Sequence, residues 1–308
     1  MASSKVQVRD RDRLIFQAIY SCQTLTTPQI SARFFPPETR DANRDVRSNE
    51  SVSAGCRRRL KQLYEAKYLS RREIPTTYKE GKKPYAYSLT KRSLEIVAEE
   101  LGVSVGDLDW RPEYSEIKTG KQAHLIAIND VRFSIGIDAE ERGFTITEWL
   151  IERKLKRMKL KAYIPDSSGR KRKTAFEPDG YFCLFIPNER EGGGHTYPNF
   201  IEVDRGTEHI GTSSYKDFRN YFKNKIPPYL SFYRSGDYER VFGFEHMRVL
   251  FITTDQQRLD KMKAVTEELN GGSQFWFTTI DEITAPESAL TKRIWKVAGQ
   301  EEAYPLVW

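Results

Sequence analysis

The stretch from Phe176 to Glu208 constrains the fold of this chain more than any other part of it. It predicts two apolar-rich strands, Phe176–Ile186 and Asn199–Asp204, which are joined by a polar loop over Pro187–Pro198. Side chains alternate between the two faces of a strand, and in both strands this alternation gathers carboxylates on one face. We therefore expect a sheet built around this pair of strands, with acidic groups on one side.

The acidic groups are Asp179 on the first strand and Glu202 and Asp204 on the second. If the strands are neighbours, the three carboxylates converge, and like charges at short distance need a cation. Their oxygens suit Mg²⁺ or Mn²⁺, which would activate water and stabilise charge on a scissile phosphate. The alternative is a structural ion-pair cluster at the sheet end, in which Glu202 or Asp204 pairs with Arg205 or a lysine.

The positive charge of the chain is unevenly distributed. Residues 1–122 contain 23 Lys and Arg against 16 Asp and Glu, whereas residues 123–308 contain 27 of each, so the net charge of +7 lies in the first part. An excess of this kind is expected of a segment that approaches a polyanion such as DNA. Two further basic stretches, Arg153–Lys161 and Gly169–Lys173, directly precede the acidic strands.

The N-terminal part has the pattern of a winged helix-turn-helix. Helical periodicity over residues 9–21, a second helix starting near Thr27 and a basic third helix over residues 53–67 precede a hairpin with strands Arg71–Ile74 and Tyr85–Leu89. The third helix would enter the major groove, and the basic hairpin would lie along the DNA backbone. The predicted DNA-binding residues are Arg57, Arg58, Arg59, Lys61, Arg71, Arg72, Lys79, Lys82 and Lys83. The alternative for these charges is a solvated helix face.

The chain is expected to divide into a winged-helix domain over residues 1–102, a polar linker over 103–122 and an α/β domain over 123–308, which the resemblance given below makes nuclease-like. The last of these has the predicted order α-β-β-β-α-β-α-β, which indicates a mixed sheet with helices on its faces. Within it, the helix that starts near residue 214 is expected to break at Pro227-Pro228.

Several classes of protein are excluded by composition. The three cysteines, Cys22, Cys56 and Cys183, lack CxxC spacing and are expected to be reduced core thiols. The four histidines lack zinc-ligand spacing. No run of about 18 apolar residues and no N-terminal signal segment is present, so we expect a cytoplasmic protein with no membrane contact.

The motif PDG, followed by a strand ending in EVD, resembles the PD-(D/E)xK nuclease superfamily. More narrowly, three segments together resemble the plasmid replication-relaxation proteins, which include MobC-type relaxases: CRRRLKQLYEAKYL, HLIAINDVRFSI, and EPDGYFCL with NFIEVDRGTE and YKDFRNYFKNKI. The resemblance covers most of the chain. It implies a winged helix-turn-helix followed by a restriction-endonuclease-like mixed-sheet αβββαβ core.

The resemblance also implies roles for particular residues. Asp179 and Glu202 match the two acidic motif positions, and Asp204 stands where the family pattern has lysine. Lys216 or Lys223, on the helix after the second strand, would supply the missing positive charge from another backbone position. Further candidates around the motif are Glu148, Glu152, Arg205, Glu208 and His209. A tyrosine nucleophile would come from Tyr215, Tyr221, Tyr229 or Tyr233, for which core packing is the other interpretation.

Taken together, these features predict a metal-dependent DNA endonuclease or nickase of a plasmid or other mobile element. The catalytic set would be Asp179, Glu202, Asp204, Lys216 and Glu152, with Mg²⁺ or Mn²⁺ held by Asp179, Glu202 and Asp204. Its partner would be double-stranded DNA, such as an origin or a palindromic site on which a homodimer would fit. The alternatives are a non-catalytic replication or mobilisation factor with a degenerate nuclease fold, and a protein-interaction adaptor.

Overall fold

The computed structural model of the chain describes residues 6–36, 46–48, 52–74, 84–115, 119–165, 168–188, 192–206 and 215–307. The chain divides into two compact units, Met1–Ser134 and Ile135–Trp308, which we describe separately. The segment expected to be a linker contains two 3-10 turns, η2 (Val105–Asp107) and η3 (Pro112–Ser115), and the first residues of the long helix α5 (Thr119–Glu141).

The N-terminal unit packs helices around a small antiparallel sheet. Its helices are α1 (Asp10–Cys22), α2 (Thr27–Phe34), α3 (Ala54–Glu65) and α4 (Lys91–Leu101). Its strands are β1 (Leu25–Thr26), β2 (Leu69–Glu73) and β3 (Tyr85–Leu89), arranged in the order β1-β3-β2. Side-chain oxygens of Thr26 and Ser53 accept the backbone amides of Gln29 and Cys56, and so cap α2 and α3. The cap of α2 is therefore Thr26, and the helix begins at Thr27, as its sequence indicated.

Among the described residues, the C-terminal unit contains a seven-stranded mixed sheet in the order β12-β11-β10-β9-β8-β7-β4. Its strands are β4 (Thr145–Ile151), β7 (Gly180–Asn188), β8 (Gly193–Val203), β9 (Arg248–Thr253), β10 (Phe275–Thr279), β11 (Trp295–Val297) and β12 (Ala303–Tyr304). The β8–β9 and β9–β10 pairs are parallel, and the remaining pairs are antiparallel.

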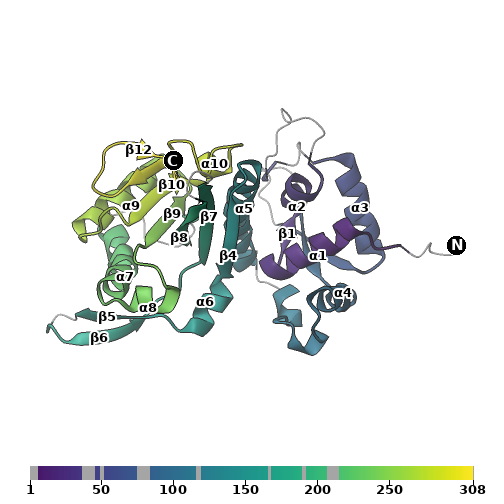
Figure 1. The fold of residues 1–308 in the computed structure, drawn as a ribbon, viewed down its shortest axis with the longest axis horizontal. Helices are drawn as coiled ribbons and strands as arrows, with labels where there is room; N and C mark the ends of the chain where they lie inside the picture. Colours follow the sequence, from purple (N-terminus) through teal and green to yellow (C-terminus); the bar gives the residue numbers. More distant parts are fainter. Residues whose placement is uncertain are drawn as a thin grey trace. The chain divides into compact units, whose positions relative to one another are not determined.

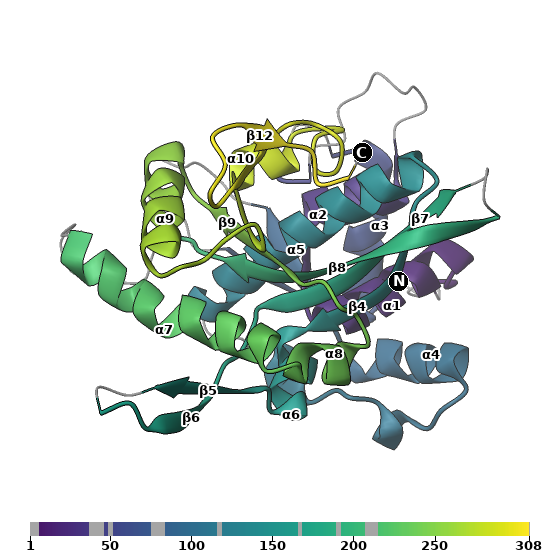
Figure 2. The ribbon, with the colours of Figure 1, turned by 60° about the vertical axis from the view of Figure 1, so that its left-hand side comes forward.

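Helices cover both faces of this sheet. Helices α7 (Tyr215–Arg234), α8 (Asp237–Phe242) and α9 (Gln256–Glu268) lie on one face, and the end of α5 lies on the other (Figures 1 and 2). The short helix α10 (Ile280–Thr284) follows β10. The expected order of helices and strands occurs as α5, β4, β7, β8, α7, β9, α9 and β10, so the mixed α and β architecture is confirmed.

Buried aromatic side chains fill the space between the sheet and α7. Phe200 of β8 lies with its ring centroid 5.4 Å from that of Tyr229 and 5.1 Å from that of Tyr181. Phe232 and Tyr238 close the same cluster and are also buried. Burying each such side chain stabilises the fold by about 1.5–3 kcal/mol, so these contacts hold α7 on this face of the sheet.

The β7–β8 hairpin is longer than its sequence indicated. Residues 193–198 were expected in the loop, but they belong to β8 and pair with β7 as far as Asn188 opposite Gly193. Gly194 is required there by close packing, because a Cβ at this position would lie 2.4 Å from the Ile186 carbonyl oxygen and 2.5 Å from the Phe185 ring. A run of glycines is typical of a loop, but here Gly193 and Gly194 belong to a strand, and the Phe185 side chain lies close to Gly194.

Helix α7 continues through Pro227 and Pro228, where a break was expected. A proline inside a helix removes a backbone hydrogen bond and crowds the preceding turn, at a cost of about 3 kcal/mol. The residues that follow offset this cost, because Tyr229, Leu230 and Phe232 are all buried against the sheet only if the helix continues.

The basic segment before β7 has its own structure. Residues expected as a basic stretch and a basic turn form helix α6 (Glu152–Met158) and a separate two-stranded hairpin of β5 (Lys161–Pro165) and β6 (Lys171–Ala175). Figure 2 shows this hairpin running alongside α7.

The three cysteines are free and buried, as expected of core thiols. Burial raises the pKa of Cys56 to about 12, which leaves it as the unreactive thiol. Within the ranges that the structure describes, no helix combines the length and the apolar character needed to cross a bilayer.

Candidate functional site

Glu202, near the end of β8, is a buried carboxylate held by two side chains of α7. Lys225 Nζ donates to its Oε2 over 2.7 Å, and the Tyr229 hydroxyl donates to its Oε1 over 2.7 Å. Lys225 and Tyr229 are four residues apart, so they lie on one face of the helix. Glu202 is 4% exposed, whereas 29% of the Lys225 side chain is exposed, so the pair connects the core to the surface.

The pKa values of Glu202 and Tyr229 are both shifted from their ordinary ranges. Burial raises the pKa of Glu202; the Lys225 charge opposes this rise and the Asp179 charge adds to it. Burial and the charge of Glu202 raise the pKa of Tyr229 well above its ordinary value, so the phenol acts as a proton-bearing donor to the carboxylate. Strongly shifted groups of this kind are typical of functional sites.

Asp179 directly precedes β7 and lies beside the end of β8. Its amide donates to the Ile201 carbonyl over 3.1 Å, and its Oδ2 accepts the Val203 amide over 2.8 Å. The β7–β8 register, in which Gly180 lies opposite Ile201, continues to Asp179 opposite Glu202, so Asp179 lies on the α7 face of the sheet. Its charge raises the pKa of both Glu202 and Tyr229. The structure therefore brings together two of the three predicted carboxylates.

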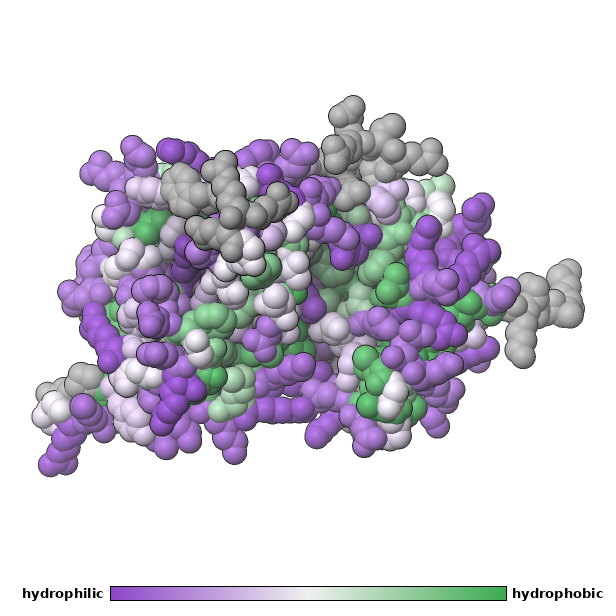
Figure 3. All heavy atoms as spheres, viewed as in Figure 1, coloured by the Kyte–Doolittle hydropathy of each residue, from purple (hydrophilic) through white to green (hydrophobic). Residues whose placement is uncertain are grey.

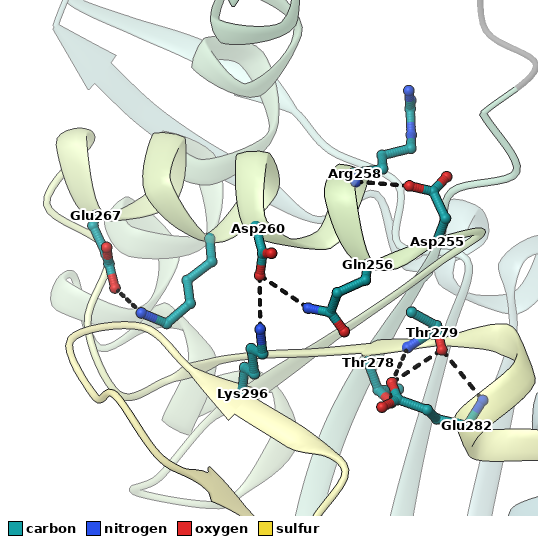
Figure 4. Close-up of polar contacts among 10 residues, drawn as sticks. Asp255, Gln256, Arg258, Asp260, Glu267, Thr278, Thr279, Glu282 and Lys296 are labelled. Carbon is teal, nitrogen blue, oxygen red and sulfur yellow. Dashed lines mark hydrogen bonds and ion pairs between the residues drawn. The ribbon is translucent and has the colours of Figure 1, made fainter.

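Asp204 is engaged differently. Arg258 of α9 donates to both of its oxygens, from Nε over 2.6 Å and from a terminal nitrogen over 3.0 Å. Arg258 lies in the first turn of α9, where its amide is bonded by the capping carboxylate of Asp255 (Figure 4). The interpretation of Asp204 as part of an ion pair at the sheet end matches this geometry, with Arg258 in place of Arg205.

Lys225 was missed by the sequence analysis. The helix after β8 was expected to break at the prolines, which left Lys225 at its frayed end rather than in its middle. The available signal was the i,i+4 spacing of Lys225 and Tyr229, which becomes visible once α7 is extended through Pro227 and Pro228.

Other predicted site residues lie apart from this pair or outside the described residues. Glu152 begins α6 and pairs with Lys156, which also pairs with Glu177. Glu148 is an exposed residue of β4, opposite Cys183. Glu208 and His209, and the side chains of Lys216, Lys223, Tyr215 and Tyr221, lie outside the described residues. In the part of the chain that is described, no group of three or more His, Cys, Asp and Glu side chains could hold a metal ion.

The structure separates the predicted DNA-binding residues of α3 into two kinds. Arg57, Arg58 and Lys61 are exposed, whereas Arg59 is half-buried. The Arg59 guanidinium donates to both carboxylate oxygens of Asp12 and, over 2.7 Å, to the Gln7 carbonyl.

The predicted hairpin residues follow the same division. The Arg71 guanidinium lies over the rings of Tyr64 and Tyr85, 4.1 and 4.4 Å from their centroids. Arg72 is exposed on β2. Lys79, Lys82 and Lys83 lie outside the described residues.

Comparison with known proteins identifies one family. The sequence model described as replication-relaxation matches residues 16–243, which span most of the N-terminal unit and the site around Glu202. Neither a curated protein nor a solved structure matches the sequence.

Proposed function

Since the chain belongs to the replication-relaxation family, we propose that it is a DNA-binding, metal-dependent endonuclease or nickase of the relaxase type. Membership suggests a role in plasmid replication or mobilisation. The observation that carries the catalytic part of the proposal is the Lys225–Glu202 pair beside Asp179. It supplies the two acids and the lysine of a PD-(D/E)xK site, with the lysine placed on α7 instead of the strand.

We assign DNA recognition to the N-terminal unit as a winged helix-turn-helix. The order α1, β1, α2, α3, β2, β3 is the order of that motif, and α3 is in the place of the recognition helix. The exposed Arg57, Arg58 and Lys61 on α3, with Arg72 on β2, would contact DNA. We leave Arg59 out of this surface because Asp12 already holds its guanidinium.

Replacing Arg57 and Arg58 together by alanine is expected to weaken binding of duplex DNA. Removing one phosphate contact lowers the slope of log affinity against log salt by about 0.9, so the slope should fall by about 2 for this double variant. Fluorescence anisotropy with labelled duplex across a salt series measures this. The Arg13→Ala/Lys91→Ala variant removes the same charge from solvent-accessible positions of α1 and α4 and should leave the slope unchanged. An equal effect of both variants would indicate a general charge effect and no recognition surface.

In the proposed site, the residues of the chain have separate tasks. Tyr229 fixes the orientation of Glu202 by donating to Oε1, and the Val203 amide fixes Asp179. Lys225 balances the Glu202 charge and, with part of its side chain exposed, is able to approach a phosphate oxygen. The Asp204–Arg258 pair fastens the end of β8 to α9 and so holds the position of Glu202 two residues earlier.

We assign a divalent cation to Asp179 and Glu202, and it would reach Glu202 once Lys225 moves away from Oε2. Mg²⁺ keeps several waters and is commonly held by one or two carboxylates together with substrate phosphates, so a third protein carboxylate is not required. Asp179 and Glu202 share one sheet face and their charges interact, which is the condition that a cation relieves. The metal would supply charge stabilisation at the phosphate and an activated water. Asp204, whose oxygens Arg258 occupies, is not included in this set.

The proposal is tested by incubating supercoiled plasmid that carries the cognate origin with the full chain and Mg²⁺ or Mn²⁺. Nicked product is expected, is lost when EDTA is added, and is lost in the Asp179→Ala and Lys225→Ala variants. Lys263→Ala is the matched control, because Lys263 also pairs with a glutamate on a helix of the same unit, over 2.6 Å. Absence of product from the wild-type chain, or equal activity of Asp179→Ala, would contradict the catalytic proposal.

A second candidate is a DNA-binding replication or mobilisation factor that does not cut. The bonding of both Glu202 oxygens by Lys225 and Tyr229 favours it, because a carboxylate in that state is closed to a metal until Lys225 moves. Tight binding to origin DNA that is unaffected by Glu202→Gln and by EDTA, with no nicked product, would identify this second function.

A further inference from the structure

The strongest concentration of positive charge in the chain lies in the C-terminal unit, over α6 and the β5–β6 hairpin. Residues 152–175 contain ten Lys and Arg against two Asp and Glu, a net charge of +8, which exceeds the +7 of the whole chain. The rest of the C-terminal unit is therefore acidic on balance. A local excess of this size attracts a polyanion to one place on the unit.

One face of the hairpin is packed on the protein near its base, at Ala162, and the other face is exposed. Cross-strand register pairs Tyr163 with Lys173, and alternation along each strand places Lys161 and Lys171 on the same side as these two residues. Ala162, on the opposite side, is buried. We call the exposed set of Lys161, Tyr163, Lys171 and Lys173 the hairpin face; the Tyr163 side chain within it is 45% exposed.

The hairpin is fastened to the helix that carries Lys225 and Tyr229. The Ser231 hydroxyl of α7 accepts the Tyr163 amide over 3.1 Å and donates to the Tyr163 carbonyl over 2.9 Å. Phe176, just after β6, packs its ring 5.0 Å from that of Tyr229. The hairpin lies at the lower left in Figure 1, and the space-filling view shows hydrophilic side chains among paler ones there (Figure 3).

From this arrangement we propose that the hairpin face binds single-stranded DNA next to the Glu202 site. Lysines on a flat ladder neutralise phosphates along an extended strand, and the exposed Tyr163 ring offers a surface on which a base stacks. The exposed Tyr163 ring favours a single strand over a duplex, because the bases of a duplex are already stacked on one another, whereas those of a single strand are able to stack on an aromatic side chain. The inference rests on the proposed function, since it takes DNA as the partner, and it adds where the strand exposed at a nick is held.

The test uses the full chain and a labelled oligodeoxythymidine of about 20 nucleotides, with anisotropy measured between about 50 and 200 mM salt. Lys161→Ala/Lys171→Ala/Lys173→Ala should lower the salt slope by about 2, because each phosphate contact to a single strand contributes about 0.7. Tyr163→Ala should weaken binding roughly fivefold to 150-fold, and Tyr163→Phe, which keeps the ring, should bind as the wild type does. The control variant Arg240→Ala/Arg293→Ala removes two exposed arginines from the same unit and should have no effect.

Binding to random duplex and to anionic vesicles is measured in parallel. Three results for the triple lysine variant would overturn the inference. These are unchanged binding to the oligonucleotide, equal reductions of binding to the single strand and to random duplex, and a reduction of binding to the vesicles alone. Separate assays measure the binding of origin duplex, which depends on Arg57 and Arg58, and the nicking of plasmid, which depends on Lys225. If nicking fails in the wild-type chain while the hairpin variants still bind the oligonucleotide more weakly, the proposed function fails and the inference stands. If nicking occurs and the hairpin variants bind normally, the inference alone fails.

Discussion

Replacing Glu202 by glutamine is expected to lower metal-dependent nicking by at least about 100-fold, in the range seen when a metal-site or acid–base group is removed. The glutamine retains the shape of the side chain and an oxygen that accepts from Tyr229. It lacks the charge that would hold a cation and that Lys225 balances. The rate of nicking of supercoiled origin plasmid measures this change.

The same substitution is expected to leave the C-terminal unit as stable as the wild type, or to stabilise it. Burial raises the pKa of Glu202 in the folded chain, so its ionised form is less favourable there than in the unfolded chain. A carboxyl of this kind contributes stability below its unfolded pKa of about 4.3, and that contribution is lost as the pH rises through the folded value. The melting temperature of Glu202→Gln minus that of the wild type should therefore increase from about pH 4 toward neutral pH.

Glu267 provides a control of opposite sign. Against the effect of burial, bonds from Lys263 and from the Gly299 amide, over 2.6 and 2.7 Å, lower the pKa of Glu267. Its contribution to stability is present above the unfolded pKa and is lost as the pH falls through the folded value. Glu267→Gln should therefore destabilise the unit at neutral pH and leave nicking unchanged. If Glu202→Gln instead behaves as Glu267→Gln does in both assays, the Lys225–Glu202 pair is a structural ion pair.

The parts of the fold that sequence predicts well are those with strong local signals. The strand over Tyr85–Leu89 was expected with the same bounds, because a short run of aromatic and apolar residues beside a basic loop is typical of a hairpin strand. The start of α2 at Thr27 is likewise set within one turn, because the Thr26 side chain accepts the Gln29 amide. For the candidate site, Asp179 and Glu202 were predicted from strand alternation, which needs only local geometry.

The parts that sequence did not predict depend on contacts between distant segments. Continuation of α7 through two prolines requires the buried contacts of Tyr229 and Phe232, which become available only when the sheet is in place. Lys225 was expected at the end of a helix that in fact continues. The failure to predict Lys225 as a partner of Glu202 therefore follows from the failure to predict that α7 continues. The pairing of Asp204 with Arg258, 54 residues later, is of the same kind.

The run Arg57-Arg58-Arg59 gives a further example, since three identical side chains have different environments. Arg59 directly follows its two exposed neighbours along α3, but its guanidinium reaches Asp12, 47 residues earlier in the chain. Asp12 is 1% exposed. The hydrogen bond to Asp12 raises the pKa of the Arg59 guanidinium. Periodicity alone places Arg59 near the core side of α3, but it does not supply the partner that makes this position acceptable.

Replacing Asp12 by alanine is accordingly expected to lower the free energy of unfolding of the N-terminal unit by about 1.5–3 kcal/mol. This is the usual contribution of hydrogen bonds to a charged group, and the half-buried Arg59 keeps part of its access to water. Asp12 also accepts the Arg9 amide over 2.8 Å at the start of α1, so the variant loses a helix-end bond as well. Urea denaturation followed by hydrogen exchange of peptides from α1 and α3 measures the change in this unit.

The double variant Asp12→Ala/Arg59→Ala separates the pair from its parts. Because it removes the stranded charge, it should be more stable than Asp12→Ala alone, and the cycle gives the coupling energy. Arg13→Ala is the control on the same helix: Arg13 pairs with Glu100 over 2.6 Å at a solvent-accessible position, and its removal should leave the urea midpoint unchanged.

DNA binding by Asp12→Ala distinguishes a structural role of the pair from a simple charge effect. Removing an acidic side chain makes the unit more positive, so electrostatics alone would strengthen binding to DNA. If the Asp12–Arg59 pair instead holds α3 in the place from which Arg57 and Arg58 reach the duplex, the variant should bind more weakly at temperatures where the wild type is folded. Stronger binding by Asp12→Ala, with protection of α3 from hydrogen exchange retained, would show that α3 does not depend on this pair.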